Sequence, residues 1–199
     1  RKQFLFGIIL LALFLLIIES SVRISEYKEP NCAFMLKDAL DNLDLSLKKT
    51  ICNDLNNLDY EEPNILRHVP NQHFSTLNIN SHGFRGSEID MEKPDDTIRI
   101  FLVGGSTVVG LGSASDDVTI TGYLQKHFDS TDLNVEVINA GIGKSYSLKE
   151  EWYVKNYLIQ FDPDIIIIYS GGNDARYRAT EPEITEQPFL KQLMLKLQY

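Results

Sequence analysis

Three short segments of this sequence combine glycine with residues suited to acyl transfer. They are residues 104–107 (Gly-Gly-Ser-Thr), 139–143 (Asn-Ala-Gly-Ile-Gly) and 170–174 (Ser-Gly-Gly-Asn-Asp). Acyl transfer needs a nucleophile and hydrogen-bond donors aimed at the developing oxyanion. Ser106 offers a hydroxyl and its own backbone N–H, and Asn173 offers a neutral side-chain donor. The segments therefore predict a serine-dependent acyl-transfer site.

Each of these segments follows an apolar run typical of a strand, at residues 98–103, 135–139 and 165–169. Amphipathic helical patterns separate the strands, at residues 120–128 and at 154–161. This alternation predicts a parallel sheet with right-handed crossovers in a three-layer α/β/α sandwich. Ligands of such folds bind at the carboxyl ends of the strands, so we expect the three segments to meet. The third run is apolar on both faces and is expected to be buried between layers.

Four blocks together resemble the SGNH hydrolases, also called GDSL-type esterases and lipases. They are Asn80-x-x-Gly83-Phe84-Arg85, F-L-V-G-G-S-T, V-I-N-A-G-I and P-D-I-I-I-I-Y-S-G-G-N-D. The resemblance covers about half of the chain, residues 78–177, and implies a flavodoxin-like fold. It implies that Ser106 is the nucleophile and that the oxyanion hole contains Asn173 and a backbone N–H of Gly143 or Lys144. We expect neither a cofactor nor a metal ion.

The sequence departs from the family pattern at three points. Gly105 stands where the GDSL motif has aspartate, and Lys144 stands where N-A-G-x-x-G has its last glycine. The family's general base is a histidine in a D-x-x-H motif near the C-terminus, and no histidine follows His127. The base histidine and its aspartate are therefore expected beyond residue 199.

The histidines that are present are interpreted as structural. His127 lies on the apolar side of its helical pattern and is expected to pack in the core. His82 occupies a turn position that the family leaves variable. His68 and His73 are expected to be solvated residues of a linker, and Arg85 is expected to pin the segment that enters the core.

Residues 4–18 form an unbroken apolar run preceded by Arg1 and Lys2. Extending the run from Gln3 to Val22 gives the roughly 20 residues that a membrane-spanning helix needs, so we interpret residues 1–22 as an anchor. Alternatives are a signal peptide, although no small-x-small cleavage site follows, and a buried helix, although no polar face is present. The basic residues favour a cytoplasmic N-terminus and an exported remainder.

Residues 23–77 are expected to be a helical region and a linker, ahead of the α/β domain at 78–199. Leucine and isoleucine recur at helical spacing through residues 33–58. One straight helix would separate Cys32 and Cys52 by about 30 Å, too far for a disulfide. A break near residues 41–46, with Ser46 capping a second helix, would allow them to pair. Both arrangements remain open, and zinc is disfavoured because no histidine lies at ligand spacing.

The net charge of −9 disfavours nucleic-acid binding. Neither a P-loop nor a dinucleotide-binding glycine motif can be placed on residues 104–112. The sequence thus favours a membrane-anchored esterase or acyltransferase that acts outside the membrane on an acylated small molecule, glycan or lipid. The alternative is a non-catalytic surface protein that keeps the fold for binding.

Overall fold

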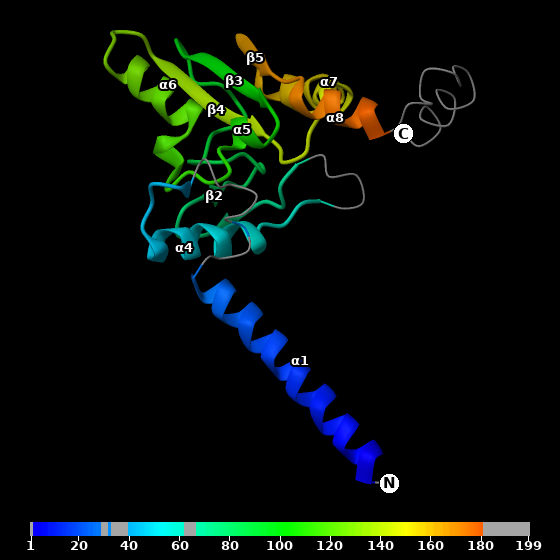
Figure 1. The fold of residues 1–199 in the computed structure, drawn as a ribbon. Helices are drawn as coiled ribbons and strands as arrows, with labels where there is room; N and C mark the ends of the chain where they lie inside the picture. Colours follow the sequence, from blue (N-terminus) through cyan, green and yellow to red (C-terminus); the bar gives the residue numbers. More distant parts are fainter. Residues whose placement is uncertain (1, 29–31, 33–39, 62–66, 181–199) are drawn as a thin grey trace, which may run out of the picture.

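The computed structural model describes residues 2–28, 32, 40–61 and 67–180 (Figure 1). It is a mixed α/β structure with an apolar N-terminal helix. In chain order the elements are α1 (Lys2–Lys28), α4 (Leu45–Asn56), β1 (Gln72–His73), β2 (Asn78–Ile79), β3 (Ile98–Gly104), α5 (Ser106–Val109), η1 (Asp116–Val118), α6 (Ile120–Asp129), β4 (Val135–Gly141), α7 (Ser147–Asn156), η2 (Leu158–Phe161), β5 (Ile165–Tyr169) and α8 (Gly172–Thr180).

The predicted parallel sheet is confirmed, with strand order β4-β3-β5. The register places Gly104, the last residue of β3, opposite Gly141 of β4 and Tyr169 of β5. All three strands therefore end level with one another. The three glycine-rich segments therefore follow the sheet at the same end, where the carboxyl ends of the strands lie.

An aromatic cluster holds one face of the sheet against α7 and η2. Phe101 of β3 packs against Phe84 and Phe161, with ring centroids 5.3 Å and 6.1 Å away. Tyr153 and Leu158 are buried in the same cluster. The second helix, predicted at residues 154–161, begins and ends earlier: α7 spans Ser147–Asn156, and the 3₁₀ helix η2 carries the apolar pattern on to Phe161.

The expectation that the third strand is buried between layers is wrong for the described chain. Ile168 of β5 is 59% exposed and Tyr169 is 60% exposed, whereas Ile166 packs against the aromatic cluster. The strand pairs only with β3, so it lies at an edge of the described sheet. An apolar run shows that a strand can be buried, and it does not specify what covers each face.

Helix α6 forms as predicted, but its buried side differs from the predicted one. His127 is exposed, contrary to the expectation of a core histidine, and Tyr123 is 61% exposed. Polar side chains hold the helix to the edge of β4 instead. The Thr121 hydroxyl accepts a hydrogen bond from Asn139 Nδ2 at 3.0 Å, and Gln125 Oε1 accepts one from the Val137 backbone N–H at 2.7 Å.

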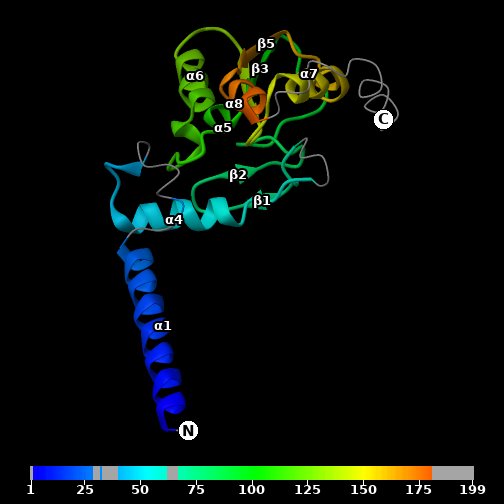
Figure 2. The ribbon, with the colours of Figure 1, turned by 45° about the vertical axis from the view of Figure 1, so that its right-hand side comes forward.

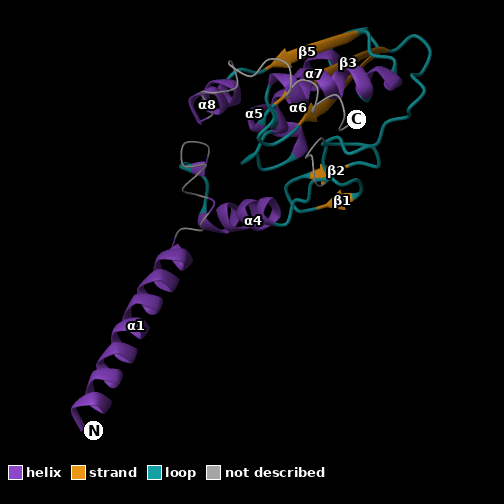
Figure 3. Cartoon of the chain, turned by 90° about the vertical axis from the view of Figure 1, so that its right-hand side faces the viewer, coloured by secondary structure: helices purple, strands orange, loops and turns teal. Residues whose placement is uncertain are grey.

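The N-terminal helix α1 projects away from the rest of the molecule (Figures 2 and 3). Its residues Gln3–Ser25 are long and apolar enough to cross a membrane, and none of that stretch is buried. The helix runs six residues beyond the predicted anchor end at residue 22, because the polar residues that follow continue the same helical backbone.

A disulfide joins Cys32 to Cys52, with the two Cα atoms 5.3 Å apart. The arrangement that brings the cysteines together is therefore confirmed. The start of α4 was predicted two residues too late: Asp44, and not Ser46, caps it by accepting from the Leu47 N–H at 3.0 Å. Most of the expected preceding helix, at 33–39, lies outside the described residues.

Candidate active site

A cavity of about 220 Å³ lies where the first and third glycine-rich segments meet. Its position follows from the level ends of β3 and β5, which are neighbours in the sheet. No residue of the second segment lines the cavity, but Ser145, two residues after that segment, does. The cavity is lined by Gly105, Ser106, Thr107, Ser145, Tyr169, Ser170, Gly171, Gly172 and Asn173.

Ser106 is the first residue of the short helix α5 and is partly exposed. The core side of the helix fixes it in place, because Val108 and Val109 are completely buried. Its backbone also lies close to β4: a methyl group added to Gly141 would be 2.4 Å from the Val109 nitrogen. The sheet therefore presents Ser106 from a rigid support with its side chain at the cavity.

Asn173 lies directly against the turn that precedes Ser106. Its Nδ2 donates to the Ser145 carbonyl at 2.6 Å, and a methyl group added to Gly105 would be 2.8 Å from the same nitrogen. An amide carries two N–H donors, so the bond to Ser145 leaves one for a ligand. Gly105 thus leaves the space that the Asn173 amide occupies.

Gly143 and Lys144, the predicted sources of a backbone donor, do not line this cavity. Gly143 is buried against Tyr60, and a methyl group added to it would be 2.6 Å from the Tyr60 hydroxyl. Lys144 is exposed and has a φ of 63°, in the left-handed region that favours glycine. The backbone at 144 thus has the conformation natural to the glycine of the N-A-G-x-x-G pattern.

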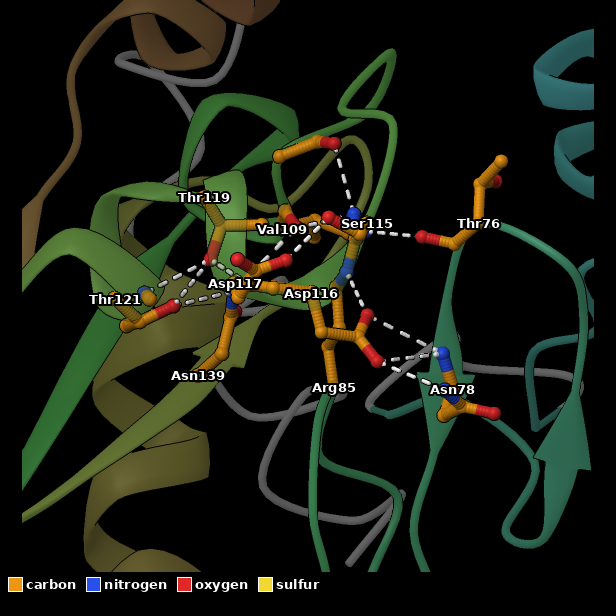
Figure 4. A network of polar contacts seen from close by, with 12 residues as sticks. Thr76, Asn78, Arg85, Val109, Ser115, Asp116, Asp117, Thr119, Thr121 and Asn139 are labelled. Carbon is orange, nitrogen blue, oxygen red and sulfur yellow. Dashed lines mark hydrogen bonds and ion pairs between the residues drawn. The ribbon is translucent and has the colours of Figure 1, made fainter. Parts of the chain in front are cut away.

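Two buried side chains hold the carbonyl groups of α5 (Figure 4). Asn139 Nδ2 donates to Val108 at 2.8 Å, and Arg85 Nη1 donates to Val109 at 3.0 Å. Arg85 Nε also donates to Asp116 Oδ1 at 2.8 Å. Burial lowers the pKa of Arg85, and the hydrogen bond and charge of Asp116 counter that effect. Arg85 is structural, as expected, and ties the incoming segment to the helix that carries Ser106.

Asp174 links the third segment to the start of α7. Its carboxylate accepts from the Ser147 backbone N–H at 3.2 Å and from the Ser147 hydroxyl. These hydrogen bonds hold the pKa of Asp174 below its usual value. The sequence predicted Asn173 as a functional residue and missed the contribution of Ser145 and Ser170, although hydroxyl residues beside glycine-rich segments are a recognisable signal.

None of the four histidines lines the cavity. The expectation that His68 is solvated is wrong: it is completely buried, with Nε2 3.3 Å from the Gly141 carbonyl oxygen and its ring 4.7 Å from Tyr60. Burial lowers the pKa of His68 to about 4. His73 is exposed, and His82 is bonded to the Ile89 carbonyl at 3.1 Å.

No protein-family model matches the sequence. No curated protein matches it either.

Proposed function

We propose that this protein is a membrane-anchored serine esterase or acyltransferase of the SGNH type, with a three-layer α/β/α domain. The observation that carries the proposal is that Ser106 and Asn173, from the ends of neighbouring strands, line one open cavity. The left-handed backbone of Lys144, at a glycine position of the family pattern, also supports it.

In the proposed reaction, the Ser106 hydroxyl attacks the carbonyl carbon of an acyl ester and forms a tetrahedral intermediate. The free N–H of Asn173 and the backbone N–H of Ser106 donate to the oxyanion. Collapse of the intermediate releases the alcohol and leaves an acyl-enzyme, which water or an acceptor hydroxyl then resolves. The family resemblance assigns proton transfer to a histidine of a D-x-x-H motif.

The size of the cavity favours a short acyl group. Pockets that enclose whole drug-sized ligands measure about 300–1,000 Å³, whereas this one measures about 220 Å³. We propose that only the ester and a small acyl portion enter it. The rest of the substrate, a glycan or lipid, would then stay outside.

The proposed location is the extracytoplasmic side of a membrane, with α1 as a single anchor. The length and composition of α1 support the anchor. The Cys32–Cys52 disulfide supports export, because disulfides persist in oxidising compartments.

The test is covalent labelling of the full-length membrane-bound protein with a fluorophosphonate, together with ester hydrolysis. We expect labelling at Ser106 and at least a ~10⁴-fold loss of activity in Ser106→Ala. Asn173→Ala is expected to lose about 10²–10³-fold in kcat, because one oxyanion donor is removed. Ser75→Ala, the same substitution at an exposed serine away from the cavity, is the control and should be fully active. Unlabelled Ser106, or unchanged activity in Ser106→Ala, would favour the non-catalytic alternative.

A further inference from the structure

Tyr60 and His68 lie opposite each other in a short antiparallel bridge that precedes the parallel sheet in the chain. Backbone hydrogen bonds of 3.1 Å on both sides close the bridge. Directly opposed residues of an antiparallel pair present their side chains on the same face. The two rings accordingly pack together, with centroids 4.7 Å apart. They form one contact surface, and both rings reach the second glycine-rich segment.

His68 contacts the last residue of β4. The side chain is completely buried, and its Nε2 lies 3.3 Å from the Gly141 carbonyl oxygen. A carbonyl oxygen can only accept, so Nε2 carries the proton and donates. Nδ1 is buried without a hydrogen-bond partner among the described residues. The bond to Gly141 is therefore the hydrogen bond that joins the ring to the end of the sheet.

Tyr60 contacts the glycine two residues further on. Gly143 is buried, and a methyl group added to it would be 2.6 Å from the Tyr60 hydroxyl oxygen but 3.4 Å from the ring carbon that bears it. The hydroxyl thus occupies the space that a side chain at position 143 would need. Gly143 does not have a positive φ, so an added side chain would meet Tyr60 without that source of backbone strain.

The turn at residues 142–145 connects these two contacts to the cavity. The Ile142 N–H donates to the Gly104 carbonyl at 2.9 Å, and the Ser145 N–H donates to the Ile142 carbonyl at 3.1 Å. The Ser145 carbonyl in turn accepts from Asn173 Nδ2 at 2.6 Å. A displacement of the turn would therefore move the acceptor that holds the Asn173 amide.

We propose that His68 and Tyr60 are positioning residues, which hold the turn at residues 142–145 and thereby fix the Asn173 amide beside Ser106. Neither residue lines the cavity, so both act through the turn. Their effect on catalysis rests on the proposed esterase function, whereas their effect on the position of Asn173 does not. The two effects are therefore measured separately.

The first experiment compares His68→Leu with His68→Gln in the full-length protein in detergent micelles. Glutamine can present a side-chain N–H to the Gly141 carbonyl, whereas leucine has no donor. His73→Leu is the matched control, since His73 is exposed. The position of Asn173 is read from its side-chain amide NMR resonance, assigned by its loss in Asn173→Asp.

We expect His68→Leu to shift the Asn173 resonance and to lower kcat about 10- to 100-fold, with KM within about twofold. His68→Gln should return both readouts toward wild type, and His73→Leu should leave them unchanged. A loss of stability in His68→Leu without a shifted resonance would show that His68 stabilises the fold and does not position Asn173.

The second experiment tests Tyr60 through Gly143. Gly143→Ala should push the turn away from the Tyr60 hydroxyl, shift the Asn173 resonance and lower kcat about 10- to 100-fold. Adding Tyr60→Phe removes that hydroxyl and leaves the nearest ring carbon at 3.4 Å, so the double variant should return both readouts toward wild type. These variants leave His68 intact and keep the test valid if His68→Leu does not fold.

The outcomes separate the two proposals. An unshifted Asn173 resonance in folded His68→Leu or in Gly143→Ala overturns the positioning role of the pair, whatever the activity. A shift in Gly143→Ala that Tyr60→Phe does not reverse excludes Tyr60. A shifted and rescued resonance in a protein whose Ser106 is neither labelled nor needed for hydrolysis supports the positioning role and rejects the esterase.

Discussion

At the scale of single residues, the candidate site depends on small clearances around Ser106. Gly105 stands where the GDSL motif that the sequence resembles has aspartate, and the space beside it is taken by Asn173. The amide of Asn173 is in turn fixed by Ser145. The glycine at position 105 thus allows Asn173 to pack closely against the turn that precedes Ser106.

The clearance at Gly105 leads to a prediction. Gly105→Ala should displace the Asn173 amide, since the added methyl group would be 2.8 Å from Nδ2. We expect kcat to fall about 10²-fold, as for loss of an oxyanion donor, with a loss of about 1 kcal/mol in unfolding free energy. Steady-state kinetics and urea unfolding measure the two effects.

The control for this prediction is the Asn173→Ala background. There the displaced amide is absent, so Gly105→Ala should lower kcat no further. A full additional loss in the double variant would mean that the methyl group acts on something other than Asn173.

At the scale of elements, hydrogen bonds from polar side chains, rather than packing of apolar faces, hold several segments in place. Helix α6 is bonded to β4 through Thr121 and Gln125, so its tyrosine and histidine remain exposed. Gln125 also occupies backbone groups on the outer edge of β4, where another strand would otherwise pair. The short α5 is held by Asn139 and Arg85.

The helical region between α1 and the sheet depends on its disulfide. Cys32 and Cys52 are 20 residues apart, so the cross-link lowers the entropy of the unfolded chain. Replacing both with serine should lower the free energy of unfolding of this region by about 3 kcal/mol. Urea unfolding followed by circular dichroism of the detergent-solubilised protein measures it.

Reducing agent provides the control for the disulfide. It should destabilise the wild-type protein by a similar amount and have no effect on the double-serine variant. An unchanged unfolding midpoint in that variant would show that the cross-link does not stabilise the region.

At the scale of the whole molecule, the segment that precedes β3 packs against the end of the parallel sheet that carries the candidate active site. His68 and Arg85 both contact backbone carbonyls near the strand ends, from a stretch that the sequence identified in part as a linker. The two short strands β1 and β2 pair in the same stretch. This segment therefore belongs to the structure that supports Ser106.

The burial of His68 predicts a pH dependence of stability. Its pKa falls from 6.5 to about 4 on folding, so the unfolded chain binds a proton more readily between these values. Stability should therefore fall as pH falls through this window, by about 2 kcal/mol between about pH 7.5 and pH 5. Urea unfolding at the two pH values measures the change.

Glutamine variants isolate the His68 contribution from the carboxylates, whose titration also changes stability in acid. His68→Gln should remove about 2 kcal/mol of the pH dependence, and His73→Gln, at an exposed position, should keep it. Equal pH dependence in both variants would contradict the assignment to His68.

The sequence by itself determined the three strands of the parallel sheet and their order along the chain. The apolar runs placed β3, β4 and β5 within two residues of their observed bounds, and the alternation with helices gave the parallel sheet. It also placed Ser106 and Asn173 just after strand ends, because a strand followed by glycine and a polar residue is a local pattern.

Only the tertiary structure decided which groups are buried and which meet. Local periodicity cannot show that β5 is an edge strand of the described sheet, that α6 is held by polar groups, or that His68 is enclosed. The pairing of Cys32 with Cys52 and the approach of Asn173 to Gly105 likewise depend on contacts between distant segments. Spacing along the chain fixes which residues share one face of an element, whereas burial depends on what packs against that face.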